Sequence, residues 1–311
     1  MKVFSGSSHP ELSQAIVEHL GVDLEKIHVS SFADGEVDVE LGTSVRGVDA
    51  VVLQSTCSPV NDLLMELIAI VDALKRASAK SVTLVMPYFG YARQDRRIGS
   101  ARIPIMAKVV ADMLAAIKVD RILIMDMHSE VMQGFFSMPI DNMYATPIFI
   151  EDILHKKLTK MKVVSPDVGG VVRARALAKK LGGSDLAIID KRRDPQHGTQ
   201  TLHTIGDVNG YHCILIDDLL DTGKTLMQAA KALKASGALS VLAYVTHPVC
   251  TAFSPDELML SDVNELIFCN TIPLRDDLQT CSKIRTMSVA PLIADVIQRV
   301  FQDKSLGDLF L

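Results

Sequence analysis

The chain has 311 residues, of which 48% are hydrophobic and 22% are charged, and its formal net charge is −5. This composition excludes a largely disordered chain and argues against general nucleic-acid binding, which favours a basic surface. No apolar stretch approaches the length of a membrane span, and residues 1–13 lack the apolar core of a signal peptide, so we expect a cytoplasmic protein without a membrane partner. The five cysteines form no C-x-x-C pair, and we expect buried free thiols.

Short apolar runs, which are typical of buried strands, alternate with helical patterns along the chain. In the first half the runs cover residues 2–4, 27–30, 50–53, 82–86 and 121–125, and helical spacing covers residues 61–77 and 104–117. The alternation then starts again, with runs at residues 162–165, 186–189, 213–216, 241–245 and 266–269 and a helix over residues 169–181.

This alternation predicts an α/β fold with two similar domains, each a mostly parallel sheet flanked by helices. Residues 121–126 and 212–217 look like equivalent strands of the two halves. We predict domains over residues 1–145 and 146–300, followed by a tail over residues 301–311 that could lie at a subunit interface. Ligands are then expected at the carboxyl ends of the strands.

Two segments of the first half have the composition of a nucleotide site. In the turn at residues 32–36, Phe32 could stack on a base while Asp34 or Glu36 accepts a hydrogen bond from an amino group. Residues 86–97 combine aromatic residues with arginines, which suit the base and the phosphates of a nucleoside triphosphate. The alternatives are a generic loop for the first segment and a nucleic-acid or protein contact for the second.

Two further strand ends carry candidate ligands for a metal ion or a diphosphate. His128 follows Asp126 by two residues, but a lone histidine is usually structural and Mg²⁺ prefers oxygen, so spacing alone favours a structural role. Asp167 precedes Gly169 and Gly170, which allow the backbone to approach an anion or a metal-bound diphosphate closely. A plain turn would explain the glycines but not Asp167.

Lys191 and Arg193 alternate in a basic segment that follows an apolar run. In an extended chain they point the same way, so they could clamp one transferring group in a loop that closes over substrate. The alternative is a solvated basic loop.

Residues 212–225, HCILIDDLLDTGKT, predict a buried strand over 213–216, an acidic loop, and the start of a helix over 226–235. A helix N-terminus binds phosphate, and carboxylates accept hydrogen bonds from sugar hydroxyls directly or through hydrated Mg²⁺. A phosphorylated ribose fits both parts. A P-loop is rejected because its first glycine would fall at Asp218. An ordinary capped loop is the alternative.

This stretch resembles the phosphoribosyl pyrophosphate-binding motif of the phosphoribosyltransferase superfamily. Together with the other segments, it makes the chain resemble the ribose-phosphate pyrophosphokinase family, also called phosphoribosyl pyrophosphate synthetases, over nearly its whole length. The matching pieces, in family order, are residues 32–36, 87–97, 126–128, 133–136, 165–170, 190–193 and 217–225.

The resemblance implies a role for each segment. ATP would be held by Phe32, Asp34, Glu36, Arg93 and Gln94. Mg²⁺ would be bound by His128 and Asp167. Ribose 5-phosphate would be bound by Asp217, Asp218, Asp221, Thr222, Gly223, Lys224 and Thr225. Lys191 and Arg193 would stabilise the transition state as the β,γ-diphosphoryl group of ATP passes to the C1 hydroxyl of ribose 5-phosphate, giving phosphoribosyl pyrophosphate and AMP.

The resemblance also implies a homo-oligomer, often a hexamer, with a regulatory site for inorganic phosphate and ADP between subunits. The matching residues are Ser44, Arg46, Ser78, Arg102, Ser305 and Phe310. Gly307 stands where a second serine is usual, and residues 250–253 depart from the usual aromatic-Ser-Gly. Two alternatives remain. A phosphoribosyltransferase would share only residues 213–225, and a non-catalytic regulatory paralogue would typically have lost site residues that this chain keeps.

Overall fold

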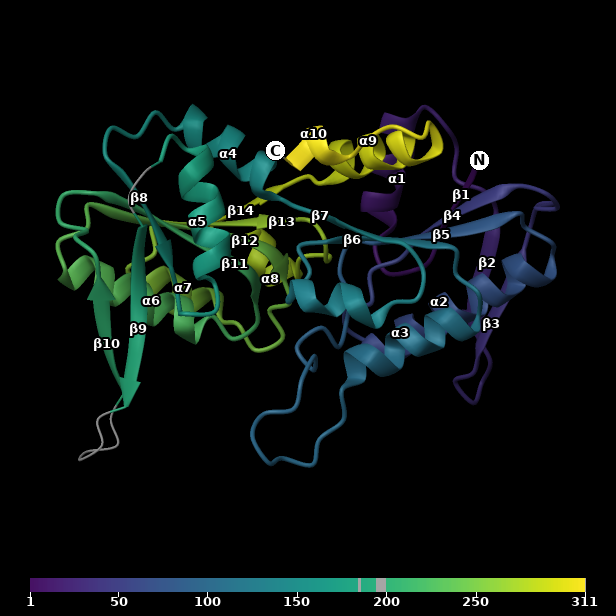
Figure 1. Ribbon diagram of the computed structural model, residues 1–311, viewed down its shortest axis with the longest axis horizontal. Helices are drawn as coiled ribbons and strands as arrows, with labels where there is room; N and C mark the ends of the chain where they lie inside the picture. Colours follow the sequence, from purple (N-terminus) through teal and green to yellow (C-terminus); the bar gives the residue numbers. More distant parts are fainter. Residues whose placement is uncertain (184–185, 194–199, 311) are drawn as a thin grey trace. The chain divides into compact units, whose positions relative to one another are not determined.

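The computed structural model describes residues 1–183, 186–193 and 200–310, with only the backbone described at 191–193, 200, 201 and 310. These residues form two compact units (Figure 1). Unit 1 comprises Met1–Tyr144, Thr271–Pro273 and the chain from Ser288 onward, and unit 2 comprises Ala145–Asn270 and Leu274–Met287. Among the described residues, the helices lack the length and apolar character that a membrane span requires.

Unit 1 contains a five-stranded parallel sheet in the order β1-β4-β5-β6-β7. Its strands are β1 (Lys2–Ser5), β4 (Asp49–Leu53), β5 (Ser81–Met86), β6 (Arg121–Met125) and β7 (Ile140–Met143). Most residues of β4, β5 and β6 are buried, as expected for parallel strands that are covered on both faces. Leu53 pairs with Val85 and Met86 with Ile124, so the carboxyl ends of these strands lie at one edge of the sheet.

The helices of unit 1 are α1 (Pro10–Leu20), α2 (Val60–Arg76), α3 (Met106–Ala116), η1 (Glu130–Phe135), α9 (Ala290–Phe301) and α10 (Gly307–Phe310). The strand predicted at residues 27–30 does not join the parallel sheet. Instead, β2 (Ile27–Ser31) pairs antiparallel with β3 (Val37–Leu41), and β3 contacts α2. Alternate residues of this hairpin, such as Val29 and Val39, pack against the core of unit 1.

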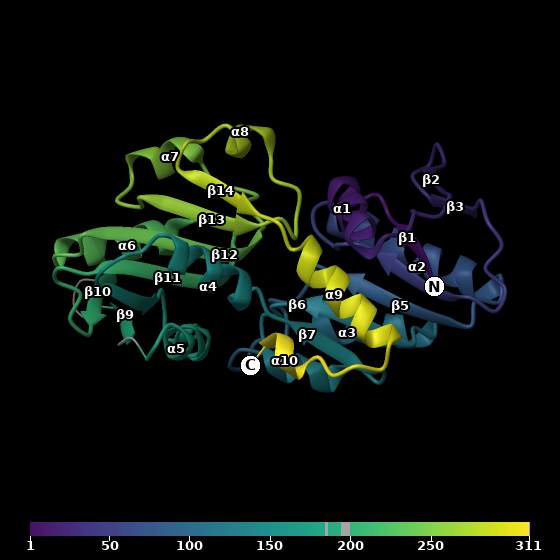
Figure 2. The ribbon, with the colours of Figure 1, turned by 90° about the horizontal axis from the view of Figure 1, so that it is seen from above.

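The chain returns to unit 1 after unit 2 has been completed. Helix α9 contacts α1, and its residues Ile293, Val296 and Ile297 are fully buried (Figure 2). The predicted division assigned residues 288–300 to the second domain, whereas they belong to unit 1. The apolar face of α9 predicts that this helix packs on another element, but it does not predict which element.

Unit 2 contains a seven-stranded sheet in the order β10-β9-β8-β11-β12-β13-β14, which is parallel except for the β9–β10 pair. Its strands are β8 (Met161–Ser165), β9 (Leu186–Arg193), β10 (Gln200–Ile205), β11 (His212–Leu220), β12 (Ser240–Pro248), β13 (Glu265–Cys269) and β14 (Ile284–Met287). Its helices are α4 (Thr146–His155), α5 (Val171–Lys180), α6 (Lys224–Ala235), α7 (Pro255–Leu260) and α8 (Asp276–Gln279). The predicted α/β class with mostly parallel sheets is confirmed.

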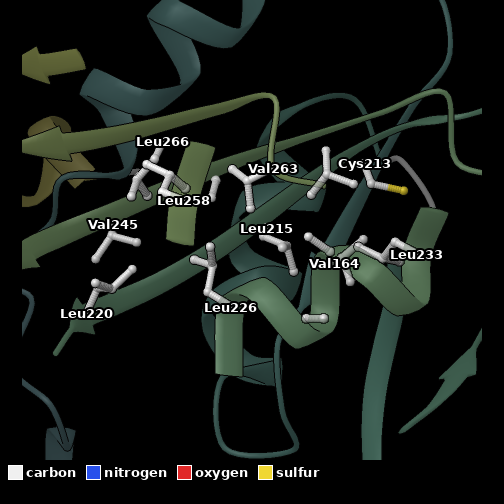
Figure 3. Close-up of a cluster of buried hydrophobic side chains, with 14 of the residues drawn as sticks. Val164, Cys213, Leu215, Leu220, Leu226, Leu233, Val245, Leu258, Val263 and Leu266 are labelled. Atoms are coloured by element: carbon white, nitrogen blue, oxygen red, sulfur yellow. The ribbon is translucent and has the colours of Figure 1, made fainter. Parts of the chain in front are cut away.

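The core of unit 2 fixes α6 against the sheet. Leu226 and Leu233 lie on one face of this helix and belong to one buried cluster with Leu215 of β11 and Val245 of β12 (Figure 3). Packing along the whole helix holds its first turn near the end of β11. Cys213 lies in the same cluster, and all five cysteines are free and buried, as predicted.

Candidate active site

Strand β11 extends further than the apolar run suggests, to Leu220, so Asp217 and Asp218 lie on the strand and not in a loop. The prediction of an acidic loop is therefore wrong for these two residues, whereas Asp221 lies in the loop that follows β11. The acids continue the strand because β11 stays paired with β12 beyond the apolar run, with Asp217 opposite Val245. Asp217 is half-buried, and Asp218 is only 4% exposed.

Gly223 makes the turn between β11 and α6. Its φ of 71° lies in the left-handed region, and a Cβ at this position would be 2.4 Å from Cε2 of Phe253. Gly223 also occupies the N-cap position of α6, where it offers no side chain to the N–H groups of the first turn. Thr222 and Lys224 beside it are exposed, and Thr225 is half-buried. A helix N-terminus without a side-chain cap is a geometry that can bind an anion, and the binding of phosphate here stays a prediction.

The two acids of β11 share one arginine, Arg173 of α5. Its Nη1 lies 3.1 Å from Oδ1 of Asp218 and 3.6 Å from Oδ1 of Asp217. Burial and the neighbouring charge of Asp218 raise the pKa of Asp217 to about 8, and Arg173 offsets only part of that effect. The two acids therefore ionise together near neutral pH only if a further positive charge is present, so a bound cation would favour the charged form of the pair.

Asp167 follows the neighbouring parallel strand β8, so it lies at the same edge of the sheet as the acids of β11. Its Oδ1 accepts a hydrogen bond from the Gly170 N–H at 3.0 Å, and its carbonyl accepts one from the Ser165 hydroxyl at 2.7 Å. A plain turn therefore accounts for the hydrogen bond of one carboxylate oxygen of Asp167 as well as for the presence of the two glycines. The charge of Asp167 also contributes to the raised pKa of Asp217, which links the three carboxylates electrostatically.

The loop after β5 differs from the prediction in its aromatic residues. Tyr88 and Phe89 are 6% and 2% exposed, and Phe89 meets Phe136 edge to face with ring centroids 5.7 Å apart. These two rings therefore belong to the core and do not stack on a base. The segment continues an apolar strand, and its first side chains fill the space under the loop. Arg93 and Gln94, by contrast, are exposed as a ligand-binding role requires.

Two hydroxyl groups hold the start of this loop. The Tyr88 N–H donates to the Ser55 hydroxyl at 3.2 Å, and the Gly90 N–H donates to the Thr56 hydroxyl at 2.7 Å. Gly90 leaves no room for a side chain, since a Cβ there would be 2.4 Å from the carbonyl oxygen of Thr56. The arginine-bearing part of the loop thus starts from a fixed backbone.

Residues 32–36 form the tip of the β2–β3 hairpin. The Phe32 N–H donates to the Glu36 carbonyl at 2.8 Å, and the Glu36 N–H donates to Oδ1 of Asp34 at 3.1 Å. Phe32 is 57% exposed, although large aromatic side chains are usually buried, and Asp34 and Glu36 are exposed as well. An exposed ring beside two acids retains the predicted capacity to bind a base.

His128 lies exposed beyond β6, where Asp126 has a positive φ of 39°. The charge of His128 acts on Asp95, which also receives a forked hydrogen bond from Arg96, with both N–O distances 2.9 Å. Burial acts to raise the pKa of Asp95, but Arg96 and the charge of His128 outweigh it and hold the pKa below its usual value. The structure therefore brings together the arginine loop and the His128 segment of unit 1.

The predicted catalytic pair lies in β9, where Lys191 is opposite Leu202 and Arg193 opposite Gln200 in the antiparallel pairing with β10. The side chains of Lys191 and Arg193 lie outside the described residues. The backbone is extended there, as the alternation argument requires.

Comparison with known proteins decides the family. A model of the N-terminal domain of ribose phosphate pyrophosphokinase matches residues 1–117, and a phosphoribosyl synthetase-associated domain matches residues 187–311. Ribose-phosphate pyrophosphokinases of Ralstonia nicotianae and Marinomonas sp. are 52% and 50% identical to the chain over 310 residues, covering 100% of this chain and 98% of each relative. The chain belongs to the ribose-phosphate pyrophosphokinase family. The predicted resemblance and the assignment as an enzyme are confirmed.

A solved structure supports this family assignment over both units. The crystal structure of phosphoribosylpyrophosphate synthetase from Mycobacterium smegmatis matches with a TM-score of 0.91 at 40% identity, covering 97% of this chain and 99% of the other. At this identity and coverage, the fold of the ribose-phosphate pyrophosphokinase family extends over the sheets, the hairpin and the returning helix α9.

The residues that match the family's regulatory site lie in unit 1. The Gly47 N–H donates to the Ser78 carbonyl at 2.8 Å, which places the segment of Ser44 and Arg46 beside Ser78. All three residues are exposed. Arg102 and Ser305 are exposed on other segments, and the side chain of Phe310 lies outside the described residues.

The structure adds residues that sequence reasoning did not select. Arg173 was visible only as one of two arginines after the Asp167 turn, and nothing in the sequence paired it with the acids of β11. Asp95 lies among the arginines of residues 86–97, and an acid among arginines was only a weak indication that it belongs to the site. Thr251 donates a hydrogen bond to Asp221, and Phe253 packs on Gly223; both contacts join segments that are far apart in sequence.

Proposed function

We propose that the chain transfers the β,γ-diphosphoryl group of ATP to the C1 hydroxyl of ribose 5-phosphate, giving phosphoribosyl pyrophosphate and AMP. The observation that carries the proposal is the end of β11, where two carboxylates share one arginine beside a left-handed glycine that opens the N-terminus of α6. A sugar phosphate needs hydroxyl acceptors and an anion site side by side, and this turn supplies both.

In this proposal the phosphate of ribose 5-phosphate binds at Thr222, Gly223, Lys224 and Thr225, and Asp217 and Asp218 orient the ribose hydroxyls. Asp221 belongs to the same turn and is fixed by Thr251. Diphosphoryl transfer needs positioning and neutralisation of charge more than it needs a covalent nucleophile. The C1 hydroxyl attacks the β-phosphorus of ATP, and AMP is the leaving group.

Mg²⁺ is the cofactor that we propose for this reaction. The oxygen donors fit Mg²⁺, because Asp167 lies at the same edge of the sheet as Asp217 and Asp218. Burial and the charge of Asp218 raise the pKa of Asp217, and a bound cation would offset that effect. Within the described ranges no cluster of three or more ligating side chains forms a ready metal cage. Mg²⁺ usually binds through one or two carboxylates, water and substrate phosphates, and it would offset charge on the diphosphoryl group. His128 is the nitrogen donor in the proposed set.

ATP is proposed to bind in unit 1, with its base at Phe32, Asp34 and Glu36 and its phosphates at Arg93 and Gln94. Lys191 and Arg193 are proposed to stabilise the charge that develops on the transferred group. Further proposals from the family are a cytoplasmic homo-oligomer, a hexamer, with phosphate and ADP as effectors. The effector site is proposed at Ser44, Arg46, Ser78, Arg102, Ser305 and Phe310.

The decisive experiment incubates the protein with Mg-ATP and ribose 5-phosphate, with and without inorganic phosphate, and quantifies AMP against ADP. AMP that depends on ribose 5-phosphate supports the proposal. A folded protein that forms no AMP would instead support the non-catalytic paralogue, and diphosphate release that depends on a base would support a phosphoribosyltransferase. Lys191→Ala should lower kcat by about 10²-fold or more, the scale of losing one preorganised charge donor. Near-normal turnover in that variant would remove Lys191 from the mechanism.

A further inference from the structure

The loop at residues 249–254, between β12 and α7, contacts the last residue of β11 and two residues of the ribose-phosphate turn, residues 221–225. The Cys250 N–H donates to the carbonyl of Leu220 at 2.9 Å, at the last residue of β11. The Thr251 hydroxyl donates to Oδ1 of Asp221. The ring of Phe253, which is 2% exposed, lies directly over Gly223. The 249–254 loop therefore contacts the chain at Leu220, at Asp221 and at Gly223.

The 249–254 loop is itself held by Arg275. Cys250 has a positive φ of 46°, a left-handed conformation that is unfavourable for a residue with a Cβ and must be maintained by surrounding contacts. Arg275 donates to the carbonyl of Cys250 through Nη1 and to the carbonyl of Phe253 through Nη2, the latter at 2.9 Å. One planar guanidinium thus fixes the loop on both sides of Thr251.

Arg275 is in turn oriented by a carboxylate. Its Nε lies 3.0 Å from Oδ1 of Asp277 and its Nη2 lies 2.7 Å from Oδ2, which is the forked geometry that sets the plane of a guanidinium. A continuous set of contacts then runs from Asp277 through Arg275 and the 249–254 loop to Asp221 and Gly223. None of these loop contacts is part of the turn motif itself.

We infer that Thr251 and Arg275 are positioning residues for ribose 5-phosphate, an inference that rests on the proposed function. Thr251 sets the orientation of the Asp221 carboxylate, and Arg275 holds Thr251 and Phe253 where they meet the turn. Neither residue needs to touch the sugar phosphate. Their effect is to keep the turn in its binding conformation before the ligand arrives, which lowers the cost of ordering it on binding.

The position that departs from the family's usual aromatic-Ser-Gly pattern lies in this loop. Residues 250–253 read Cys-Thr-Ala-Phe, and the structure gives two of them a defined task. Thr251 supplies the hydroxyl, and Phe253 supplies the surface on which Gly223 rests.

The test compares Thr251→Val, which keeps the shape but removes the donor, with Thr251→Ser, which keeps the hydroxyl. Ribose 5-phosphate binding is measured by calorimetry on the full chain in Mg²⁺, and KM for each substrate and kcat are measured by AMP formation. We expect Thr251→Val to weaken ribose 5-phosphate about tenfold, the scale of losing a hydrogen bond to a charged group, with KM for ATP unchanged. Thr251→Ser should stay within about twofold of wild type because it retains the donor.

Arg275→Met removes the support of the whole loop and should weaken ribose 5-phosphate more than Thr251→Val does. The matched control is Arg285→Met, since Arg285 is another arginine of unit 2 that binds acids, Asp152 and Glu265, away from the turn. That control should lower the unfolding midpoint without changing affinity for ribose 5-phosphate. Thr251 is exposed, so its variants report on binding even where an arginine variant unfolds.

The outcomes separate the two proposals. If wild type binds ribose 5-phosphate and Thr251→Val and Arg275→Met bind it equally well, the positioning role is overturned and the proposed function stands. An affinity loss in Arg285→Met as large as that in Arg275→Met would also overturn it, since the effect would then be general destabilisation. Wild type that fails to bind ribose 5-phosphate would overturn the proposed function and this inference together.

Discussion

The turn after β11 and the loop after β5 both follow buried parallel strands, and both carry residues proposed to bind phosphate, but they are built differently. In the turn, the proposed anion partner is the backbone at the start of α6, where Gly223 offers no side-chain cap. In the loop, the backbone is occupied by hydrogen bonds to Ser55 and Thr56, and binding is left to exposed side chains such as Arg93.

This difference decides how far each region could be read from its sequence. A backbone site depends on local conformation, and Gly223 with its neighbouring threonines predicts that conformation directly. A side-chain site depends on which residues face solvent, which the packing of the unit decides. The buried rings of Tyr88 and Phe89 show the consequence, because their composition suggested base stacking and their packing excludes it.

The largest expected effect is that of Gly223→Ala. The new Cβ would lie 2.4 Å from the ring of Phe253, and the alanine would have to adopt a positive φ. We therefore expect the unfolding free energy to fall by about 3 kcal/mol and ribose 5-phosphate binding to be lost. Urea unfolding and calorimetry measure the two effects. Gly210→Ala is the control, since Gly210 has a φ of 74° and open space around it, and should lose only about 1 kcal/mol. Equal losses in both variants would show that Phe253 does not matter.

Gly90→Ala tests the backbone of the other region. A Cβ there meets the Thr56 carbonyl oxygen at 2.4 Å with no positive φ, so overpacking alone should cost about 2 kcal/mol and displace the arginine loop. KM for ATP should rise while KM for ribose 5-phosphate stays constant, as steady-state kinetics would show. Gly134→Ala, where nothing lies within 4 Å, should change stability by less than about 0.5 kcal/mol. A rise in both KM values would contradict the assignment of this loop to ATP.

Arg93→Met and Arg96→Met separate the exposed arginines of the loop. Arg96 donates hydrogen bonds from Nε and Nη2 to Asp95. We therefore expect Arg96 to contribute less than Arg93 to phosphate binding. We expect KM for ATP to rise about tenfold in Arg93→Met and about twofold in Arg96→Met. The reverse order in initial-rate measurements would make Arg96 the phosphate ligand.

Asp217→Asn is expected to raise stability by an amount that depends on pH. Since the pKa of Asp217 is raised to about 8 in the folded protein, ionisation in the unfolded chain makes wild type lose stability as pH rises from about 4 to about 8. The amide removes that loss. The variant should match wild type near pH 4 and exceed it by an increasing margin up to about pH 8 in denaturant unfolding without Mg²⁺. A stability gain that does not grow with pH would show that Asp217 is not strained by its acidic neighbour.

Predictions from the sequence were accurate where they depended on residues close together in the chain, and less accurate where they depended on distant ones. The α/β class and the turn at Gly223 were predicted because strand, turn and helix signals are local. The length of β11 was underestimated because Asp217 and Asp218 are poor strand formers that stay paired through β12. The hairpin of β2 and β3 was missed because an apolar run does not specify its partner.

The sequence by itself determined the alternation of strands and helices, the turn at Gly223 and the set of motifs that place the chain in its family. These depend on contacts between residues that are close along the chain. Only the tertiary structure decided that α9 returns to α1, that Arg173 sits between two acids, and that Phe253 supports Gly223. Each of those contacts joins distant segments, and their partners are chosen by packing complementarity, which local propensity and hydrophobic period do not encode.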